Sequence, residues 1–225
     1  MISLSPRSIQ QSIVEWLDAR FGLVEAVEEA MLQRVPNYAN AFYYCFGGMA
    51  FILFGFLILS GILLTFYYVP SAAEAWDSVN FIMNNVYLGW LIRGVHFWSA
   101  NFMVVMVIIH MIRVYWTGSY RAPRELNWMV GVLLLLVVLG FAFTGYLLPW
   151  DEKAYWATNV GVKIAASTPI VGDFIARILY GSNDLTDATL NRFFAIHVFV
   201  LPAVAVLLMF IHFKLIRKHG ISEPL

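Results

Sequence analysis

An all-α integral membrane protein, built as a four-helix bundle, is the fold class that the sequence predicts from three observations. Of the 225 residues, 61% are hydrophobic and only 12% are charged, which leaves too little polar surface to cover a soluble globule. Four segments reach the roughly 20 mostly apolar residues that a spanning helix requires. Two of these segments each contain two histidines, and ionisable side chains inside a membrane mark functional sites.

The four predicted spanning helices cover residues 41–69, 91–115, 128–148 and 193–216. The first is long enough to predict tilt or an interfacial end. The long connection over 149–192 is expected to form short surface helices across one mouth of the bundle. We therefore predict a single membrane domain that occupies residues 1–225.

Residues 1–40 precede the first spanning helix and have apolar side chains at helical spacing. These apolar residues are Ile9, Ile13, Trp16, Leu17 and Val24. The pattern predicts an amphipathic helix that lies along the membrane interface. A helix docked on a partner subunit fits the same pattern, and neither interpretation involves chemistry.

The distribution of Lys and Arg predicts the orientation of the chain. The N-terminal segment, the connection between the second and third helices and the C-terminal tail hold nine of them, whereas the opposite side holds five. Both termini should therefore face the cytoplasmic, electronegative side of a cell membrane or photosynthetic membrane. The formal net charge is zero, and no long basic run indicates a nucleic-acid partner.

The histidine spacing predicts where the imidazoles lie on their helices. His96 and His110 are 14 residues apart, which returns to within about 40° of one helix face after a rise of about 21 Å. His197 and His212 are 15 residues apart, with an offset of about 60° in the other sense. A bend at Pro202, which lies between them, can absorb part of that mismatch.

The second and fourth helices run in the same direction, so each of two depths offers a pair of facing imidazoles. We predict an outer pair, His96 with His197, and an inner pair, His110 with His212. Two neutral imidazoles on opposite sides of a planar cofactor are the axial ligands of a six-coordinate b-type haem. Two stacked haems are therefore expected, although a lone histidine would more simply serve packing or proton transfer.

Glycines repeat at the same interval on the other two helices, Gly47 with Gly61 and Gly131 with Gly145. Glycine allows a large flat ligand to approach closely, so these residues are predicted to pack against haem. Ordinary close packing of membrane helices is the alternative explanation.

Two arginines lie near the predicted haem depths, Arg93 one turn before His96 and Arg113 three residues after His110. Arg is a natural partner for the haem propionates. Snorkelling towards the membrane interface would account for the same positions, and both roles can hold together.

Several strings give the chain a specific family resemblance. They are the run 42–48 with its CFGG, Gly89-Trp-Leu-Ile-Arg-Gly-Val-His96, Pro123-Arg-Glu-Leu-Asn-Trp128, Gly145-Tyr-Leu-Leu-Pro-Trp-Asp151 and Arg217-Lys-His-Gly-Ile-Ser-Glu-Pro-Leu225. Over nearly its whole length the chain resembles the b6-type cytochrome b subunits of cytochrome bc and b6f complexes, and is closest to the Gram-positive menaquinol-oxidising ones. The 15-residue step on the fourth helix is the b6-type interval, where mitochondrial relatives use 14.

The resemblance implies functional sites that spacing alone does not give. It implies that Pro149, Trp150 and Asp151 border an outer quinol-oxidation site and that Arg217 lies near an inner quinone-reduction site. It also implies that Cys45, the single cysteine, holds a covalently attached c-type haem. A free buried thiol and an acylation site are the alternatives for Cys45.

The resemblance also implies a mechanism and partners. The subunit would receive one electron of bifurcated quinol oxidation and pass it inward through two b haems, while the other electron leaves to a Rieske iron-sulfur protein and then a c-type cytochrome or plastocyanin. The family's Pro-Glu-Trp-Tyr motif does not occur, so a separate subunit IV-like C-terminal half and a homodimeric complex are expected. Menaquinol is favoured over plastoquinol. A dihaem anchor of another dehydrogenase and a proton-relay transporter remain the alternative functions.

Overall fold

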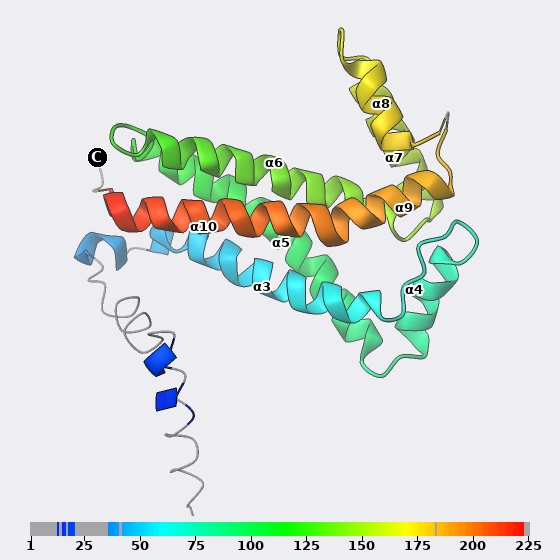
Figure 1. Ribbon diagram of the computed structural model, residues 1–225, viewed down its shortest axis with the longest axis horizontal. Helices are drawn as coiled ribbons and strands as arrows, with labels where there is room; N and C mark the ends of the chain where they lie inside the picture. The colour runs from blue at the N-terminus through cyan, green and yellow to red at the C-terminus, as the bar shows by residue number, and fades with distance from the viewer. Residues whose placement is uncertain are drawn as a thin grey trace, which may run out of the picture. The chain divides into compact units, whose positions relative to one another are not determined.

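The computed structural model describes residues 13, 15, 16, 18–20, 36–40, 42–182 and 184–222. Across these ranges every regular element is helical (Figure 1). The chain divides into two units, Met1–Asn40 and Ala41–Leu225. The predicted all-α class is therefore confirmed for the described part of the chain.

In the first unit, Ile13, Glu15, Trp16 and residues 18–20 are helical. The Arg20 guanidinium lies 4.0 Å from the centre of the Trp16 ring, and a short 3-10 helix, η1, covers Asn37–Asn40. The remainder of the predicted interfacial helix, with Ile9, Leu17 and Val24, lies outside the described residues.

Four helical stretches in the second unit are long and apolar enough to cross a membrane. They are α3 (Phe46–Thr65), α5 (Gly89–Trp116), α6 (Glu125–Leu147) and the continuous stretch Asp187–His219. The last comprises α9 (Asp187–Ala195), the π-helix η3 (Ile196–Val200) and α10 (Leu201–His219). The first stretch is shorter than predicted, because the short 3-10 helix η2 (Phe42–Tyr44) precedes it and the chain turns after Thr65.

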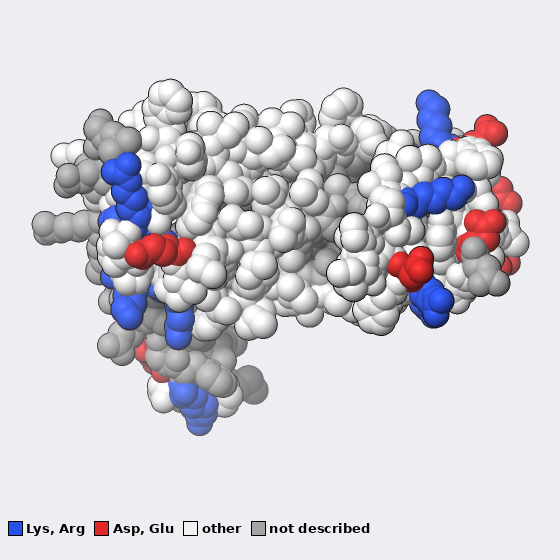
Figure 2. Space-filling view, turned by 90° about the horizontal axis from the view of Figure 1, so that it is seen from above, with Lys and Arg blue, Asp and Glu red and all other residues white. Residues whose placement is uncertain are grey.

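The bundle is apolar on its outside as well as its inside. Most large apolar side chains of the four stretches are exposed, among them Leu59, Phe102, Leu136 and Phe210. Figure 2 shows Lys, Arg, Asp and Glu gathered towards the two ends, with an uncharged belt between them. Apolar surface on this scale fits contact with lipid or with other membrane subunits.

Short helices gather at one end of the bundle, opposite η2 and the C-terminal end of α10 (Figure 1). They are α4 (Ala75–Asn84), α7 (Glu152–Ala166), α8 (Gly172–Tyr180) and α9. A buried cluster that includes Ala75, Leu147, Leu190 and Phe193 ties them to the end of α6. Burial of these side chains explains why the predicted long connection is structured.

Pairwise packing of the long helices forms the centre of the bundle. Among the described helices α3 packs most extensively on α5, and α10 packs most extensively on α6. Phe54, Met103 and Ala205 form a buried cluster from three of the four stretches. This apolar layer lies between the two histidine depths, because each of the three residues falls midway between the outer and inner sites on its helix.

Candidate haem sites

The outer histidines face each other across the bundle. His96 comes from α5 and His197 from η3, and their ring centroids lie 6.4 Å apart with the planes at 64°. A first-row metal held between two imidazoles by bonds of about 2 Å places the ring centres roughly 6 Å apart. The spacing therefore fits an ion bound by both rings.

A hydroxyl group contacts each outer histidine, and both hydroxyls belong to residues that precede a glycine. Ser60 Oγ lies 2.9 Å from Nδ1 of His96, and Thr144 Oγ1 lies 3.0 Å from Nδ1 of His197. Sequence reasoning missed both residues. The available signal was a hydroxyl residue directly before Gly61 and Gly145.

The hydroxyls define which imidazole nitrogen carries the proton. Ser60 donates its hydrogen to the Phe56 carbonyl at 2.5 Å, and Thr144 donates to the Gly140 carbonyl at 2.8 Å. Each hydroxyl has one hydrogen, so towards histidine it must accept from Nδ1–H. Nε2 then retains its lone pair and can bind a metal.

The inner histidines interact electrostatically with each other. They differ in their surroundings, because Nδ1 of each is buried without a hydroxyl partner, and the backbone of Asn127 is the hydrogen-bonding group beside His212. Phe46 and Val130 precede the inner glycines at the positions that Ser60 and Thr144 occupy at the outer level. Neither side chain offers a hydroxyl.

Each of the four repeated glycines lies beside one histidine ring. A Cβ at Gly145 would lie 2.6 Å from Cε1 of His197, and one at Gly47 would lie 2.9 Å from Cε1 of His110. A Cβ at Gly61 would lie 3.3 Å from Cε1 of His96, and one at Gly131 would lie 3.7 Å from Cε1 of His212. Glycine therefore creates space here for the imidazoles, and contact with haem remains a prediction.

The 15-residue interval on the fourth stretch includes a π-turn. His197 lies in η3, which ends directly before Leu201 and Pro202. A π-turn takes in one residue more than an α-turn, so it removes the surplus residue and turns His197 back towards the face of His212. The sequence predicted a bend at Pro202, and the structure places this adjustment one turn earlier.

The two arginines have different partners. Arg113 lies 4.2 Å from the centre of the Tyr44 ring and donates to the Tyr43 carbonyl at 3.4 Å. It thus ties the inner half of α5 to η2, directly before Cys45. Arg93 donates to the sulfur of Met83 at 3.6 Å. No described contact tests their predicted role as propionate partners.

Cys45 is exposed and lies at the N-cap of α3. It is separated by one residue from Gly47, whose backbone lies against His110. The thiol is therefore exposed close to the inner pair.

The remaining predicted residues lie at opposite ends of the second unit. Pro149, Trp150 and Asp151 join α6 to α7, and the Asp151 side chain accepts from the Ala154 amide at 2.7 Å as the N-cap of α7. Trp150 has a positive φ of 53°, a strained backbone state that is often found at functional sites. Arg217 is exposed in the last turn of α10.

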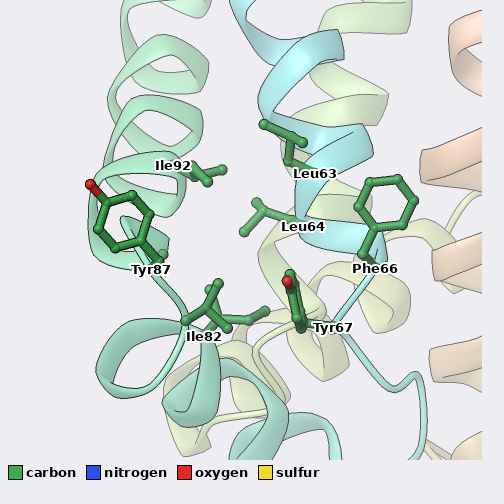
Figure 3. Close-up of a pocket in the computed structure, with 9 residues that line it drawn as sticks. Leu63, Leu64, Phe66, Tyr67, Ile82, Tyr87 and Ile92 are labelled. Carbon is green, nitrogen blue, oxygen red and sulfur yellow. The ribbon is translucent and has the colours of Figure 1, made fainter.

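A separate apolar pocket lies between the end of α3, α4 and the start of α5 (Figure 3). Leu64, Ile82 and Ile92 point towards one another in it, and Tyr67 and Tyr87 lie at its margin. None of the four paired histidines lines this pocket. It is distinct from the predicted haem sites.

The donor set of the described residues favours haem over a bare metal ion. Those residues contain no cluster of three or more His, Cys, Asp or Glu side chains that could hold a metal. Two opposed imidazoles suffice only where a macrocycle supplies the other ligands. The histidine pairs therefore fit haem iron.

Comparisons with known proteins match most of the chain. The family described as Cytochrome b/b6/petB matches residues 31–220. The menaquinol:cytochrome c reductase cytochrome b subunit of Bacillus subtilis (strain 168) is 48% identical over 95% of this chain and 98% of its own length. Cytochrome b6 of Synechococcus sp. (strain JA-3-3Ab) is 43% identical over 95% of this chain and 99% of its own.

A solved chain of a hyperthermophilic respiratory Complex III superposes with a TM-score of 0.84 at 37% identity, and the match covers 94% of this chain. This chain spans 56% of the length of that solved chain. The likeness therefore extends from sequence to the fold of the bundle. The chain belongs to the cytochrome b/b6 family.

Proposed function

We propose that this chain is the transmembrane electron-transfer subunit of a quinol:cytochrome c oxidoreductase. The observation that carries the proposal is the outer pair, in which His96 and His197 face each other at 6.4 Å with Nδ1 of each ring held by a hydroxyl. The inner pair supplies a second site, so that the bundle holds two b haems. When bound, each haem supplies a one-electron redox centre.

The residues of the chain hold and orient these centres. His96 and His197 would hold the outer haem, and His110 and His212 would hold the inner haem. Gly47, Gly61, Gly131 and Gly145 let the helices approach the rings, as their contacts with the imidazoles support. Arg93 and Arg113 neutralise the propionates, because a guanidinium is the natural partner of a partly buried carboxylate.

Quinol oxidation takes place at the outer end, beside Pro149, Trp150 and Asp151, and one electron of each quinol crosses the bundle. Quinone reduction takes place at the inner end near Arg217. Protons are released outside and taken up inside, which stores energy across the membrane. Menaquinol is the favoured substrate, since a relative named as a menaquinol:cytochrome c reductase subunit is 48% identical.

Cys45 would hold a third haem covalently at the inner end. Its exposed thiol at the N-cap of α3, two residues from Gly47 and from the Tyr43 carbonyl that Arg113 contacts, supports this assignment. A Cys45→Ser variant should lose haem staining of the denatured polypeptide while it keeps the two b haems. Staining that persists in the variant contradicts covalent attachment at this residue.

The assembly completes the outer site. We assign as partners a separate subunit that carries the C-terminal half of cytochrome b, a Rieske iron-sulfur protein and a c-type cytochrome, in a homodimeric complex. Both termini face the cytoplasmic, electronegative side, as the excess of Lys and Arg in those segments supports.

The test is a dithionite-reduced difference spectrum of the native complex, together with identification of its subunits and its extracted quinone. Two b-type components, a co-purifying Rieske protein and bound menaquinone are expected. A peripheral dehydrogenase in place of the Rieske protein would favour a dihaem anchor. A complex without b-type bands would favour a proton-relay transporter and refute the assignment.

A further inference from the structure

The two histidine pairs differ in the residues that lie beside Nδ1 of their rings. At the outer level Ser60 and Thr144 are buried, with 5% and 4% of their surface exposed. Each hydroxyl is part of a short chain that runs from histidine through the hydroxyl to a helix carbonyl. At the inner level no described hydroxyl contacts Nδ1 of either histidine, and the backbone of Asn127 is the hydrogen-bonding group beside His212.

We propose that Ser60 and Thr144 are positioning residues that make the outer haem the harder of the two to reduce. The inference rests on the proposed function, since it requires a haem between His96 and His197. It assigns to two hydroxyl groups a role in the direction of electron flow.

The physical argument concerns the charge on the axial nitrogens. An imidazole that donates Nδ1–H to an acceptor gains electron density at Nε2 and becomes a more basic ligand. A hydroxyl that donates its own hydrogen to a carbonyl is a better acceptor, because neighbouring hydrogen bonds polarise one another. A more basic ligand stabilises oxidised iron, so the outer haem holds an electron less tightly than the inner one.

This arrangement follows a repeat in the sequence. Phe46 and Ser60 are 14 residues apart, as are Val130 and Thr144, and each directly precedes one of the four repeated glycines. The repeat thus places a hydroxyl beside each outer ring and an apolar side chain at each equivalent inner position. Val130 is 6% exposed and has nearly the shape of threonine, so a hydroxyl can be exchanged between levels with little change in volume.

The experiment is a redox titration of the b-type absorbance bands in the native complex of three variants, Ser60→Ala, Thr144→Val and Val130→Thr. The first two should raise the midpoint of the lower-potential component. The loss of one such hydrogen bond predicts about a two- to tenfold change in the reduction equilibrium, or up to about 59 mV for one electron. Val130→Thr should lower the higher-potential component instead.

Matched controls separate this effect from general loosening. Thr65 makes the same bond to its own helix, with Oγ1 donating to the Ile62 carbonyl at 2.7 Å, and no described bond joins it to a histidine. Thr65→Ala should leave both midpoints unchanged. Ser60→Thr and Thr144→Ser retain a hydroxyl and should restore the wild-type midpoints.

The outcomes distinguish this inference from the proposed function. A wild-type complex without b-type bands contradicts the proposed function before any variant is compared. A complex with both bands, whose midpoints do not move in Ser60→Ala and Thr144→Val, contradicts only the role of the hydroxyls. The role of the hydroxyls is also overturned if Val130→Thr and Thr144→Val shift the midpoint of the same component. If Ser60→Ala fails to assemble, the nearly isosteric changes Thr144→Val and Val130→Thr decide the question.

Discussion

The outer and inner halves of the bundle use the same ligands with different support. Both present one histidine from α5 and one from the fourth stretch, and both place a glycine of α3 or α6 beside each ring. The outer rings have hydroxyl partners, whereas the inner half instead gathers Arg113, η2 and Cys45. A repeated scaffold has thus acquired two chemical environments.

The largest expected effect comes from removing one ligand at each level. His197→Ala should abolish the outer b component and retain the inner one, while His212→Ala should do the reverse, because each pair serves its own haem. Haem per polypeptide and the reduced difference spectrum provide the measurement. Loss of both components in both variants would show that the two sites do not form independently.

Substitution of glycine by alanine should affect the outer and inner histidine levels of α6 to different extents. Gly145→Ala places a methyl group 2.6 Å from the His197 ring, and overpacking of this kind costs about 1–3 kcal/mol. Gly131→Ala meets the His212 ring at 3.7 Å, an ordinary contact. Thermal release of haem should therefore shift far more in Gly145→Ala.

On α3 the order of the levels should reverse, since a methyl group at Gly47 lies closer to its histidine than one at Gly61. Gly55→Ala is the control, because a Cβ there has no neighbour within 4 Å. Equal sensitivity at Gly47, Gly55 and Gly61 would show that the contacts with the rings are irrelevant.

The two arginine variants should differ in stability by a smaller amount. Arg113→Gln loses a cation–π contact with Tyr44 and a bond to the Tyr43 carbonyl, for which about 1–2 kcal/mol is expected. Arg93→Gln loses a weak donor contact to Met83. Unfolding of the complex in denaturant should be shifted more by Arg113→Gln, and the opposite ranking would contradict the asymmetry.

The smallest effect is expected from the tyrosines that tie each end together. Tyr68 donates to the Leu148 carbonyl at 2.7 Å at the outer end, and Tyr44 donates to the Ser222 carbonyl at 3.1 Å at the inner end. Burial raises the pKa of the Tyr68 hydroxyl, so it remains a donor at neutral pH.

Tyr68→Phe and Tyr44→Phe should each cost about 1 kcal/mol, with the greater loss for the shorter bond of Tyr68. The contribution of Tyr68 is present below the ordinary tyrosine pKa and falls as pH rises through the raised value. Denaturant midpoints at neutral and alkaline pH would measure both effects. A denaturant midpoint for Tyr68→Phe equal to that of wild type would show that this hydrogen bond does not stabilise the protein.

The sequence predicted the class of fold and the level of each histidine, because helical periodicity and hydrophobic length are local properties. It did not predict that Ser60 and Thr144 would contact the imidazoles, since such contacts depend on how α3 and α6 rotate against their neighbours. The start of α3 was also missed, because residues 42–45 are apolar whether they form an α-helix or η2. The quinone-site residues are assigned from family resemblance, because the chain itself shows only where they lie.

The π-turn in η3 bears on how this helix tolerates changes in length. An extra residue in a regular helix would rotate everything beyond it by about 100° and carry His212 away from its partner. The wide turn confines that disturbance to Ile196–Val200. Deleting one residue there should let η3 relax to an α-helix with both histidines still facing inward, so the register of the fourth stretch is buffered against insertion and deletion.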